Sequence, residues 1–231
     1  MQKTDTTNEI EKMFQAGVQF GFVRSRRHPT VKPFIFGVKN RTEIFDLEKT
    51  SDLLTKAKAF VTSLAAEGKT LLFVGSKAEA RGAIETAAGS LGMPYVASRW
   101  IGGALTNFGE IKKRIEKLKN LTTQKEKGEL SKYTKKERLL IDREIDKLTR
   151  MYGGLGDMKE VPGALFVVDS KHEHIAVEEA HSRKLPVVAL CGSDCDLKEV
   201  DYPIVGNDSS KASIAFFLKE IVDAYQAGKK Q

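Results

Sequence analysis

The chain has 231 residues, a formal net charge of +7 at pH 7, and 41% hydrophobic and 8% aromatic residues. This length and apolar content are sufficient for one sizeable domain with an appendage. No run approaches the roughly 18 apolar residues of a membrane span, and the start of the chain lacks the apolar core of a secretory signal. Two cysteines, Cys191 and Cys195, are too few for a disulfide framework. We therefore expect a cytoplasmic protein that does not associate with membranes.

Two segments hold the excess positive charge. Residues 110–150 contain fourteen Lys or Arg and eight Asp or Glu residues, whereas residues 12–42 contain seven Lys or Arg residues and no acidic residue. The remainder of the chain has 17 basic and 23 acidic residues. A mildly acidic body with two cationic surfaces is typical of a protein that binds a polyanion, and it indicates nucleic acid.

The first part of the chain begins with a short helix, predicted at residues 8–15. A basic arm follows over about residues 16–42, which is punctuated by Gly and Pro and is too irregular for a helix. Short strands are predicted at 33–37 and 42–45. Thr50 or Ser51 is expected to cap a helix that runs to about Glu67. The next predicted elements are a buried strand at 70–74, a helix at 78–91 that ends at Gly92, and a short strand at 94–96.

A second pattern interrupts this alternation at residues 105–152. Heptad-seam spacings of three and four residues separate Phe108, Ile111, Ile115 and Leu118, and again separate Ile141, Ile145, Leu148 and Tyr152. They predict an antiparallel coiled-coil hairpin whose arms extend roughly 25–30 Å. We expect residues 105–152 to be an inserted unit, and residues 1–104 and 153–231 to form the body. On this division the body should fold even when Glu110–Thr149 is replaced by a short linker.

The alternation of strands and helices resumes after the hairpin. A buried strand is predicted at 164–168, and Ser170 and Glu173 have capping-box spacing for a helix that ends near Arg183. Strands at 186–190 and 202–205 follow, and a final amphipathic helix begins at Asp208 or Ser209. The pattern predicts the α/β class, with an open three-layer α/β/α sandwich around a mostly parallel sheet.

One motif lies at the junction of the body and the hairpin. It spans Ser98–Phe108, holds the only tryptophan, and reads S-R-W-I-G-G-A-L-T-N-F. It resembles the R-W-x-G-G-x-L-T-N-F/W motif of the bacterial ribosomal protein S2 family. The other segments that match the family, in order along nearly the whole chain, are 16–18, 33–37, 46–50, 72–75, 135–137, 166–169 with 172–174, and 206–208.

This resemblance implies a flavodoxin-like sandwich with an inserted helical hairpin, and a structural constituent of the small ribosomal subunit. It implies no catalysis, no cofactor and no homo-oligomer. The implied partners are 16S ribosomal RNA and neighbouring ribosomal proteins, among them the large mRNA-binding protein S1. Two departures from the family stand in the arm. The usual H-F-G-H is replaced by Gln19-Phe20-Gly21-Phe22, and the Trp-Asn before Pro29 is replaced by Arg27-His28, so RNA contacts through those histidines do not transfer.

The basic arm supplies the first RNA-binding candidates, because guanidinium groups bind phosphate bidentately and stack on bases. They are Arg24, Arg26, Arg27, Lys32, Lys39 and Arg41. The arm contains no acid to neutralise them, so we expect Arg24, Arg26 and Arg27 to contribute more than hairpin-tip lysines such as Lys125 and Lys127. The interleaved phenylalanines at 20, 22, 34 and 36 are interpreted as core anchors, above all Phe34 and Phe36.

The junction motif and the base of the hairpin supply the remaining candidates. Gly102 and Gly103 permit a tight turn and a close approach to phosphate. Trp100 is interpreted as a packing plug, whereas Arg99 and Asn107 are RNA-binding candidates. Lys112, Lys113 and Arg114 join them near the base of the hairpin, where a rigid body would present them to RNA.

A flavodoxin-like nucleotide-binding enzyme is the alternative function. The loops after the parallel strands, at 75–77, 169–170 and 192–193, are where doubly wound folds bind ligands. The first of them matches neither G-x-G-x-x-G nor G-x-x-x-x-G-K-S/T, however, and no G-x-S-x-G occurs. A structural interpretation is preferred for His172, His174, Cys191 and Cys195, with a zinc or magnesium ion at these strand ends as the alternative.

Overall fold

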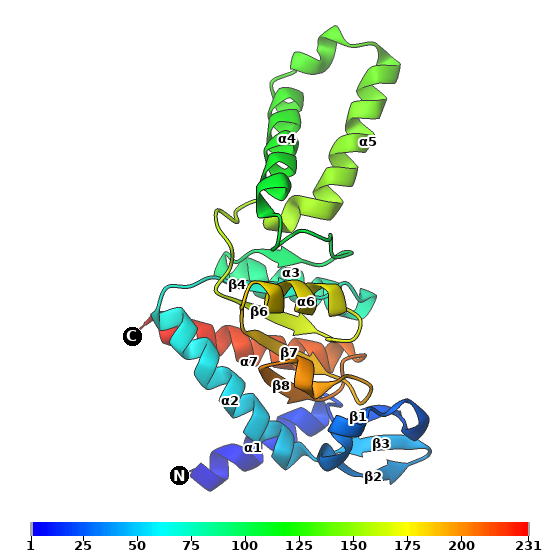
Figure 1. Ribbon diagram of the computed structural model, residues 1–231, viewed down its shortest axis with the longest axis vertical. Helices are drawn as coiled ribbons and strands as arrows, with labels where there is room; N and C mark the ends of the chain where they lie inside the picture. Colours follow the sequence, from blue (N-terminus) through cyan, green and yellow to red (C-terminus); the bar gives the residue numbers. More distant parts are fainter. Residues whose placement is uncertain (1, 231) are drawn as a thin grey trace.

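The computed structural model describes the backbone of residues 2–230 and the side chains of residues 8–230. The molecule is elongated, with an α-helical hairpin at one end, a parallel sheet in the middle, and a small sheet beside the first helix at the other end (Figure 1). The central sheet consists of β4 (Leu71–Val74), β5 (Tyr95–Val96), β6 (Ala164–Val168), β7 (Val187–Cys191) and β8 (Tyr202–Val205). Its strands are all parallel and run in the order β5-β4-β6-β7-β8.

Helices cover both faces of this sheet, which confirms the predicted flavodoxin-like α/β/α sandwich. One face packs against α2 (Leu47–Ala66), α3 (Ala78–Leu91) and α7 (Lys211–Lys229). The other packs against α6 (His174–Ser182) and the segments on either side of the hairpin. Because both faces are covered, every residue of β4, β6 and β7 is buried, which explains why these strands are unbroken apolar runs.

The predicted hairpin is confirmed as two antiparallel helices, α4 (Phe108–Glu126) and α5 (Lys135–Tyr152). Ile111, Ile115, Ile145, Leu148 and Tyr152 are buried along its seam. Gly128, with a φ of +71°, ends α4 and leads into a short 3-10 helix, η3 (Glu129–Lys132). Thr134 and Glu137 then form a capping box that starts α5.

The base of the hairpin is continuous with the core of the body. Ile111, Ile115 and Leu148 belong to the same buried cluster as Leu165 and Val167 of β6. The 3-10 helix η4 (Gly153–Leu155) returns the chain to the body, and its Leu155 is buried in that cluster. The third layer of the sandwich is therefore built partly from the inserted segment. The division at residues 105 and 152 stays a proposal.

The basic arm is a folded unit and not an irregular segment. It forms a three-stranded antiparallel sheet of β1 (Phe20–Val23), β3 (Thr42–Phe45) and β2 (Ile35–Lys39), in that order. Two 3-10 helices, η1 (Arg24–Arg26) and η2 (Pro29–Phe34), connect β1 to β2. The prediction missed β1 because four residues with a register irregularity show no alternation.

Several predicted helix boundaries are wrong. The first helix, α1 (Gln2–Gln15), is longer than predicted. Asp46 caps α2, whereas the hydroxyl of Thr50 donates to the carbonyl of Val205 on β8. Ser170 and Glu173 form no capping box, because Glu173 accepts hydrogen bonds from Ser76 instead. The last helix, α7, has Ser210 as its N-cap. Thr50 and Glu173 thus make tertiary contacts instead of capping a helix, which local spacing does not reveal.

Candidate nucleic-acid interface

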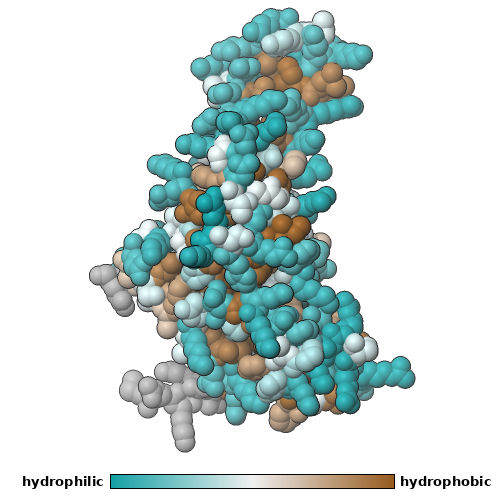
Figure 2. Space-filling view, viewed as in Figure 1, coloured by the Kyte–Doolittle hydropathy of each residue, from teal (hydrophilic) through white to brown (hydrophobic). Residues whose placement is uncertain are grey.

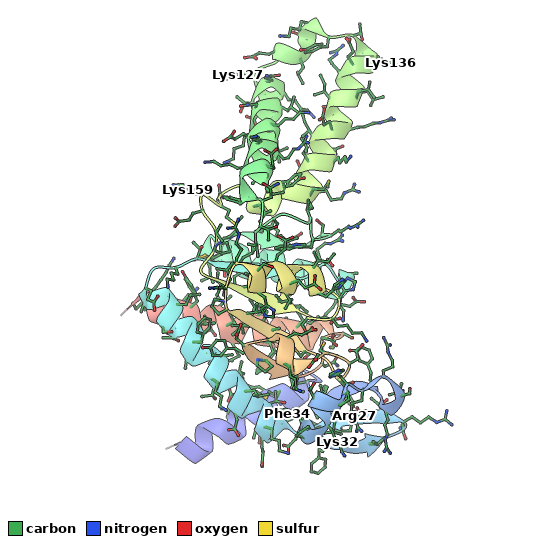
Figure 3. The ribbon with its side chains drawn as sticks, in the orientation of Figure 1. Arg27, Lys32, Phe34, Lys127, Lys136 and Lys159 are labelled. Carbon is green, nitrogen blue, oxygen red and sulfur yellow. The ribbon has the colours of Figure 1, made fainter. Side chains whose placement is uncertain are left out.

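The arm sheet presents most of its predicted basic candidates to solvent. Arg24, Arg26, Lys32, Lys39 and Arg41 are all exposed. Asn40 and Arg41, with φ values of +51° and +67°, form a tight turn between β2 and β3. Figure 3 shows that Arg27 and Lys32 of the arm lie at the end of the molecule opposite to Lys127 and Lys136 of the hairpin.

Arg27 is different, because it faces inward. Its Nη1 donates to Oε1 of Glu43 at 2.9 Å, and the Glu43 side chain is fully buried. Arg26 lies over the ring of Phe22, 4.5 Å from its centroid, and 3.7 Å from a carboxylate oxygen of Asp194. The expectation that no acid neutralises the arm arginines is therefore wrong for Arg27 and Arg26, because their acidic partners follow the arm in sequence.

The interpretation of the arm phenylalanines as core anchors is wrong for two of them. Phe36 is 80% exposed and Phe20 is 47% exposed. Val31 and Phe45 fill the small core of the arm instead, and Phe34 packs partly against them. Residue Phe36 lies on β2, an edge strand of a sheet with one covered face, so alternation brings it to the open side.

The junction motif is held by one buried carboxylate, that of Glu179 on α6. Oε1 accepts from Trp100 Nε1 at 3.1 Å and from the Gly103 amide at 2.7 Å. Oε2 accepts from the amides of Leu105 and Thr106 and from the Thr106 hydroxyl, at 3.0 to 3.1 Å. Burial by itself would raise the pKa of Glu179, but these hydrogen bonds outweigh burial and hold the pKa below its usual value.

Arg183, one turn after Glu179, completes the attachment of the loop. Its guanidinium donates to the carbonyls of Leu105 and Thr106 at 3.1 and 2.6 Å. Trp100 is only 5% exposed, which confirms its interpretation as a packing plug. Arg99 and Asn107, at the two ends of this fixed loop, are both exposed. Glu179 and Arg183 were not predicted, because nothing in a helical E-E-A-H-S-R run marks two of its side chains as partners of a distant loop.

The hairpin candidates are all exposed, but they differ in their partners. Lys113 pairs with Glu110 at 2.6 Å, whereas Lys112 and Arg114 form no ion pair among the described side chains. Further along the hairpin, Lys117 pairs with Glu144, and Lys125 with Asp142 at 2.8 Å. Acidic partners thus offset part of the lysine charge along α4, and Lys112 and Arg114 keep theirs unpaired at the base.

Comparison with known proteins identifies the family. The sequence model described as Ribosomal protein S2 matches residues 13–228. The chain belongs to the ribosomal protein S2 family. Small ribosomal subunit protein uS2 of Nitratiruptor is 44% identical over 221 residues, which are 96% of this chain and 83% of that protein. The protein of the same name in Chlorobaculum tepidum is 42% identical over 94% of this chain and 88% of that protein.

Membership of the ribosomal protein S2 family, a family of structural proteins, disfavours the enzyme alternative. The structure accounts for the two departures from the family motif in terms of packing. Gln19 is buried, Phe22 lies beneath Arg26, and Arg27 pairs with Glu43. His28 Nδ1 lies 2.8 Å from the Thr30 hydroxyl. Phe22, Arg27 and His28 therefore make contacts that stabilise the arm sheet.

The carboxyl ends of the strands hold the other titratable cluster of this S2 family member. Lys77 Nζ lies 2.5 Å from Asp169 and 2.7 Å from Asp208. Burial works to raise the pKa of Asp169, but Lys77 and the amide of His172 hold it below its usual value. Burial raises the pKa of Asp208, and Lys77 opposes that rise only in part.

Cys191 and Cys195 are buried free thiols, as the structural interpretation expects. Within residues 8–230, no three or more His, Cys, Asp or Glu side chains are grouped so that they could hold a metal ion. Likewise, none of the helices described here is long and apolar enough to cross a membrane.

Proposed function

We propose that this S2 family protein is a structural constituent of the small ribosomal subunit in the cytoplasm, and that it binds 16S ribosomal RNA. The observation that carries the proposal is the position of its free basic residues. The arm sheet, with the exposed Arg24, Lys39 and Arg41, lies at one end of the molecule, whereas α4, with the exposed Lys112 and Arg114 near its start, lies on the far side of the central sheet (Figure 1). Such a molecule bridges separate RNA segments.

The mode of binding follows from the rigidity of the two attachments. The arm sheet is fixed to the body by hydrogen bonds such as that from the Phe22 amide to Ser193 Oγ, at 2.9 Å. The junction loop is fixed by Glu179. Rigid cationic groups at set separations read the spacing of phosphates and the shape of a folded RNA, and not its base sequence.

Neighbouring ribosomal proteins complete the proposed partners, with S1 among them on the strength of the family resemblance. Most of the hairpin surface is hydrophilic, with a hydrophobic patch near the tip (Figure 2). On α5, Leu139 and Leu140 are 50% and 55% exposed. At the other end Phe36 and Val38 are exposed on β2. Exposed apolar side chains are not stabilised by contact with phosphate groups, whereas contact with another protein would bury them. We therefore infer that these two surfaces contact neighbouring proteins.

Copurification tests this function directly. An affinity-tagged full-length chain, expressed in a bacterium, is expected to copurify with small ribosomal subunits that contain 16S ribosomal RNA. A variant in which Arg24, Lys39 and Lys112 are replaced by Glu is the matched control, and it should recover fewer subunits at equal expression. Recovery of the wild-type chain free of ribosomal RNA, and as soluble as before, would contradict the proposed function.

A further inference from the structure

A pocket of about 490 Å³ opens at the carboxyl edge of the central sheet. The loops after β4, β5 and β6 contribute Ser76, Arg99 and His172 to its lining. Helix α3, which follows β4, covers one face of the sheet, and α6, which follows β6, covers the other. The pocket therefore lies at the point where the chain connections diverge, which is the usual ligand position in doubly wound folds. Its volume is in the range of small-ligand sites.

The rim of the pocket is cationic. Arg81, Arg99 and His172 are exposed, and none of them forms an ion pair among the side chains of residues 8–230. Arg81 Nε donates to the carbonyl of Ala97 at 3.0 Å, which orients its guanidinium and leaves the two terminal nitrogens available. Arg99 is adjacent to Trp100, whose position Glu179 fixes. Two guanidinium groups at one rim, one of them oriented by a hydrogen bond, are suited to a phosphate.

The interior of the pocket has the opposite character. Glu173 is 3% exposed, and its Oε1 accepts from the amide and hydroxyl of Ser76 at 2.8 and 2.5 Å. A buried carboxylate repels an anion, so a phosphate is excluded from the interior, whereas the N–H groups of a base would find an acceptor there. Ile175, 43% exposed, and the largely buried Trp100 supply apolar surface for a base.

We propose that this pocket binds one unstacked nucleotide of 16S ribosomal RNA, with its phosphate at Arg81 and Arg99 and its base against Ile175 and Trp100. The inference rests on the proposed function and adds a third RNA contact, midway between the arm and the hairpin tip. It explains why the junction loop is anchored so firmly, since the anchor fixes one rim of the pocket. Unstacked bases held on side chains and phosphates held by arginine are the usual elements of single-strand recognition.

Fluorescence of Trp100 tests the proposal, because it is the only tryptophan in the chain. Titration of the full-length protein with 16S ribosomal RNA is expected to change the Trp100 emission. The double variant Arg81→Ala/Arg99→Ala should bind the RNA about tenfold more weakly and lose the emission change. The control variant Lys56→Ala/Lys219→Ala removes the same charge from exposed positions on α2 and α7, and it should keep the emission change with a smaller loss of affinity.

The outcomes separate this inference from the proposed function. If the wild-type chain does not bind 16S ribosomal RNA, the proposed function fails. If it binds, but Arg81→Ala/Arg99→Ala behaves like the control and the emission is constant, the pocket inference is wrong and the function stands. A separate titration uses guanosine monophosphate. If it changes the Trp100 emission with an affinity equal to that of the RNA, the pocket is a site for a free nucleotide, and the inference is also overturned.

A second variant protects the test against misfolding. Ile175→Glu adds a carboxylate at the mouth of the pocket without altering either arginine, and circular dichroism should show an unchanged fold. It should weaken RNA binding and suppress the emission change as the double variant does. Binding equal to that of the wild-type chain would count against a base in the pocket.

Discussion

Glu179 gives the junction motif its conformation. A single carboxylate accepts hydrogen bonds from the indole of Trp100, the amides of Gly103, Leu105 and Thr106, and the Thr106 hydroxyl. Gly103 has a φ of +91°, a conformation that glycine adopts without strain. This conformation lets the Gly103 amide donate to the carboxylate. The motif can be recognised in the sequence, but Glu179, which organises it, lies outside the motif and cannot.

The first prediction concerns Glu179→Gln. The glutamine amide has one acceptor oxygen, and its NH2 group, a donor, replaces the other oxygen. Some donors of the junction loop therefore lose their acceptor, and the variant should lose about 2–3 kcal/mol of unfolding free energy. Thermal and urea unfolding measure the loss. Glu178→Gln, its exposed neighbour, is the matched control and should stay within about 0.5 kcal/mol of the wild type. Equal stabilities for the two variants would show that the carboxylate does not organise the loop.

The same residue predicts a pH dependence. The pKa of Glu179 is lower in the folded chain than its usual value of 4.5, so below pH 4.5 the unfolded chain binds a proton that the folded chain does not. Its contribution to stability is therefore complete above that pH and is lost as the pH falls through the lower, folded pKa. Urea titrations of the wild type and Glu179→Gln should converge in acid. A constant difference between them would contradict this.

At the scale of elements, the base of the hairpin packs with the core of the body, and we expect only its outer part to be dispensable for folding. Ile111, Ile115 and Leu148 pack in the same cluster as β6. The sequence predicted that the body folds without Glu110–Thr149, but the structure gives a reason to expect the opposite, because these three residues would be lost. The Lys117–Glu144 ion pair shows that the two helices are adjacent at that level. The outer part of the hairpin therefore begins beyond it.

A pair of deletions tests this boundary. Replacement of residues 119–143 by a short Gly-Ser linker should preserve cooperative unfolding, because the three inner seam residues stay. Replacement of residues 110–149 removes all three, each of which contributes about 2–5 kcal/mol, and should give a molten or insoluble product. Near-ultraviolet circular dichroism and thermal unfolding distinguish the two products. A well-folded long deletion would show that the base of the hairpin does not contribute to the core.

The arm and the hairpin tip should differ as RNA-binding elements. A triple alanine variant of Arg24, Arg26 and Arg27 is unsuitable for this comparison, because Arg27→Ala would leave the buried Glu43 without its partner and would destabilise the fold. We instead expect Arg24→Ala/Lys39→Ala/Arg41→Asn to bind 16S ribosomal RNA at least about tenfold more weakly than Lys127→Ala/Lys135→Ala/Lys136→Ala. Asparagine is chosen at 41 because it tolerates a positive φ. Filter binding measures the RNA affinity of the two triple variants. Equal losses of affinity would show that the hairpin tip contributes as much to RNA binding as the arm does.

At the scale of the whole molecule, the sequence predicts the central sheet from its continuous apolar runs and the hairpin from its heptad spacing. Residues 164–168 form β6 as predicted, and the seam residues of α4 and α5 are those expected from heptad spacing. In the arm sheet, β3 lies at 42–45 as predicted, β2 lies two residues later than predicted, and β1 was missed because its four residues pair with a register irregularity. Local sequence patterns do not reveal contacts with residues far along the chain. For the same reason the pairing of Arg27 with Glu43 and the anchoring role of Glu179 required the structure.

The ionic-strength dependence of 16S ribosomal RNA binding tests the central claim, that two fixed cationic ends bind the RNA backbone. Six to eight phosphate contacts imply that the affinity of the full-length chain falls by about three decades between roughly 50 and 200 mM salt. Equilibrium filter binding at several salt concentrations gives the slope, and Arg24→Ala/Lys39→Ala/Arg41→Asn should make it shallower. A nearly flat dependence, or a slope that this variant leaves unchanged, would contradict the account.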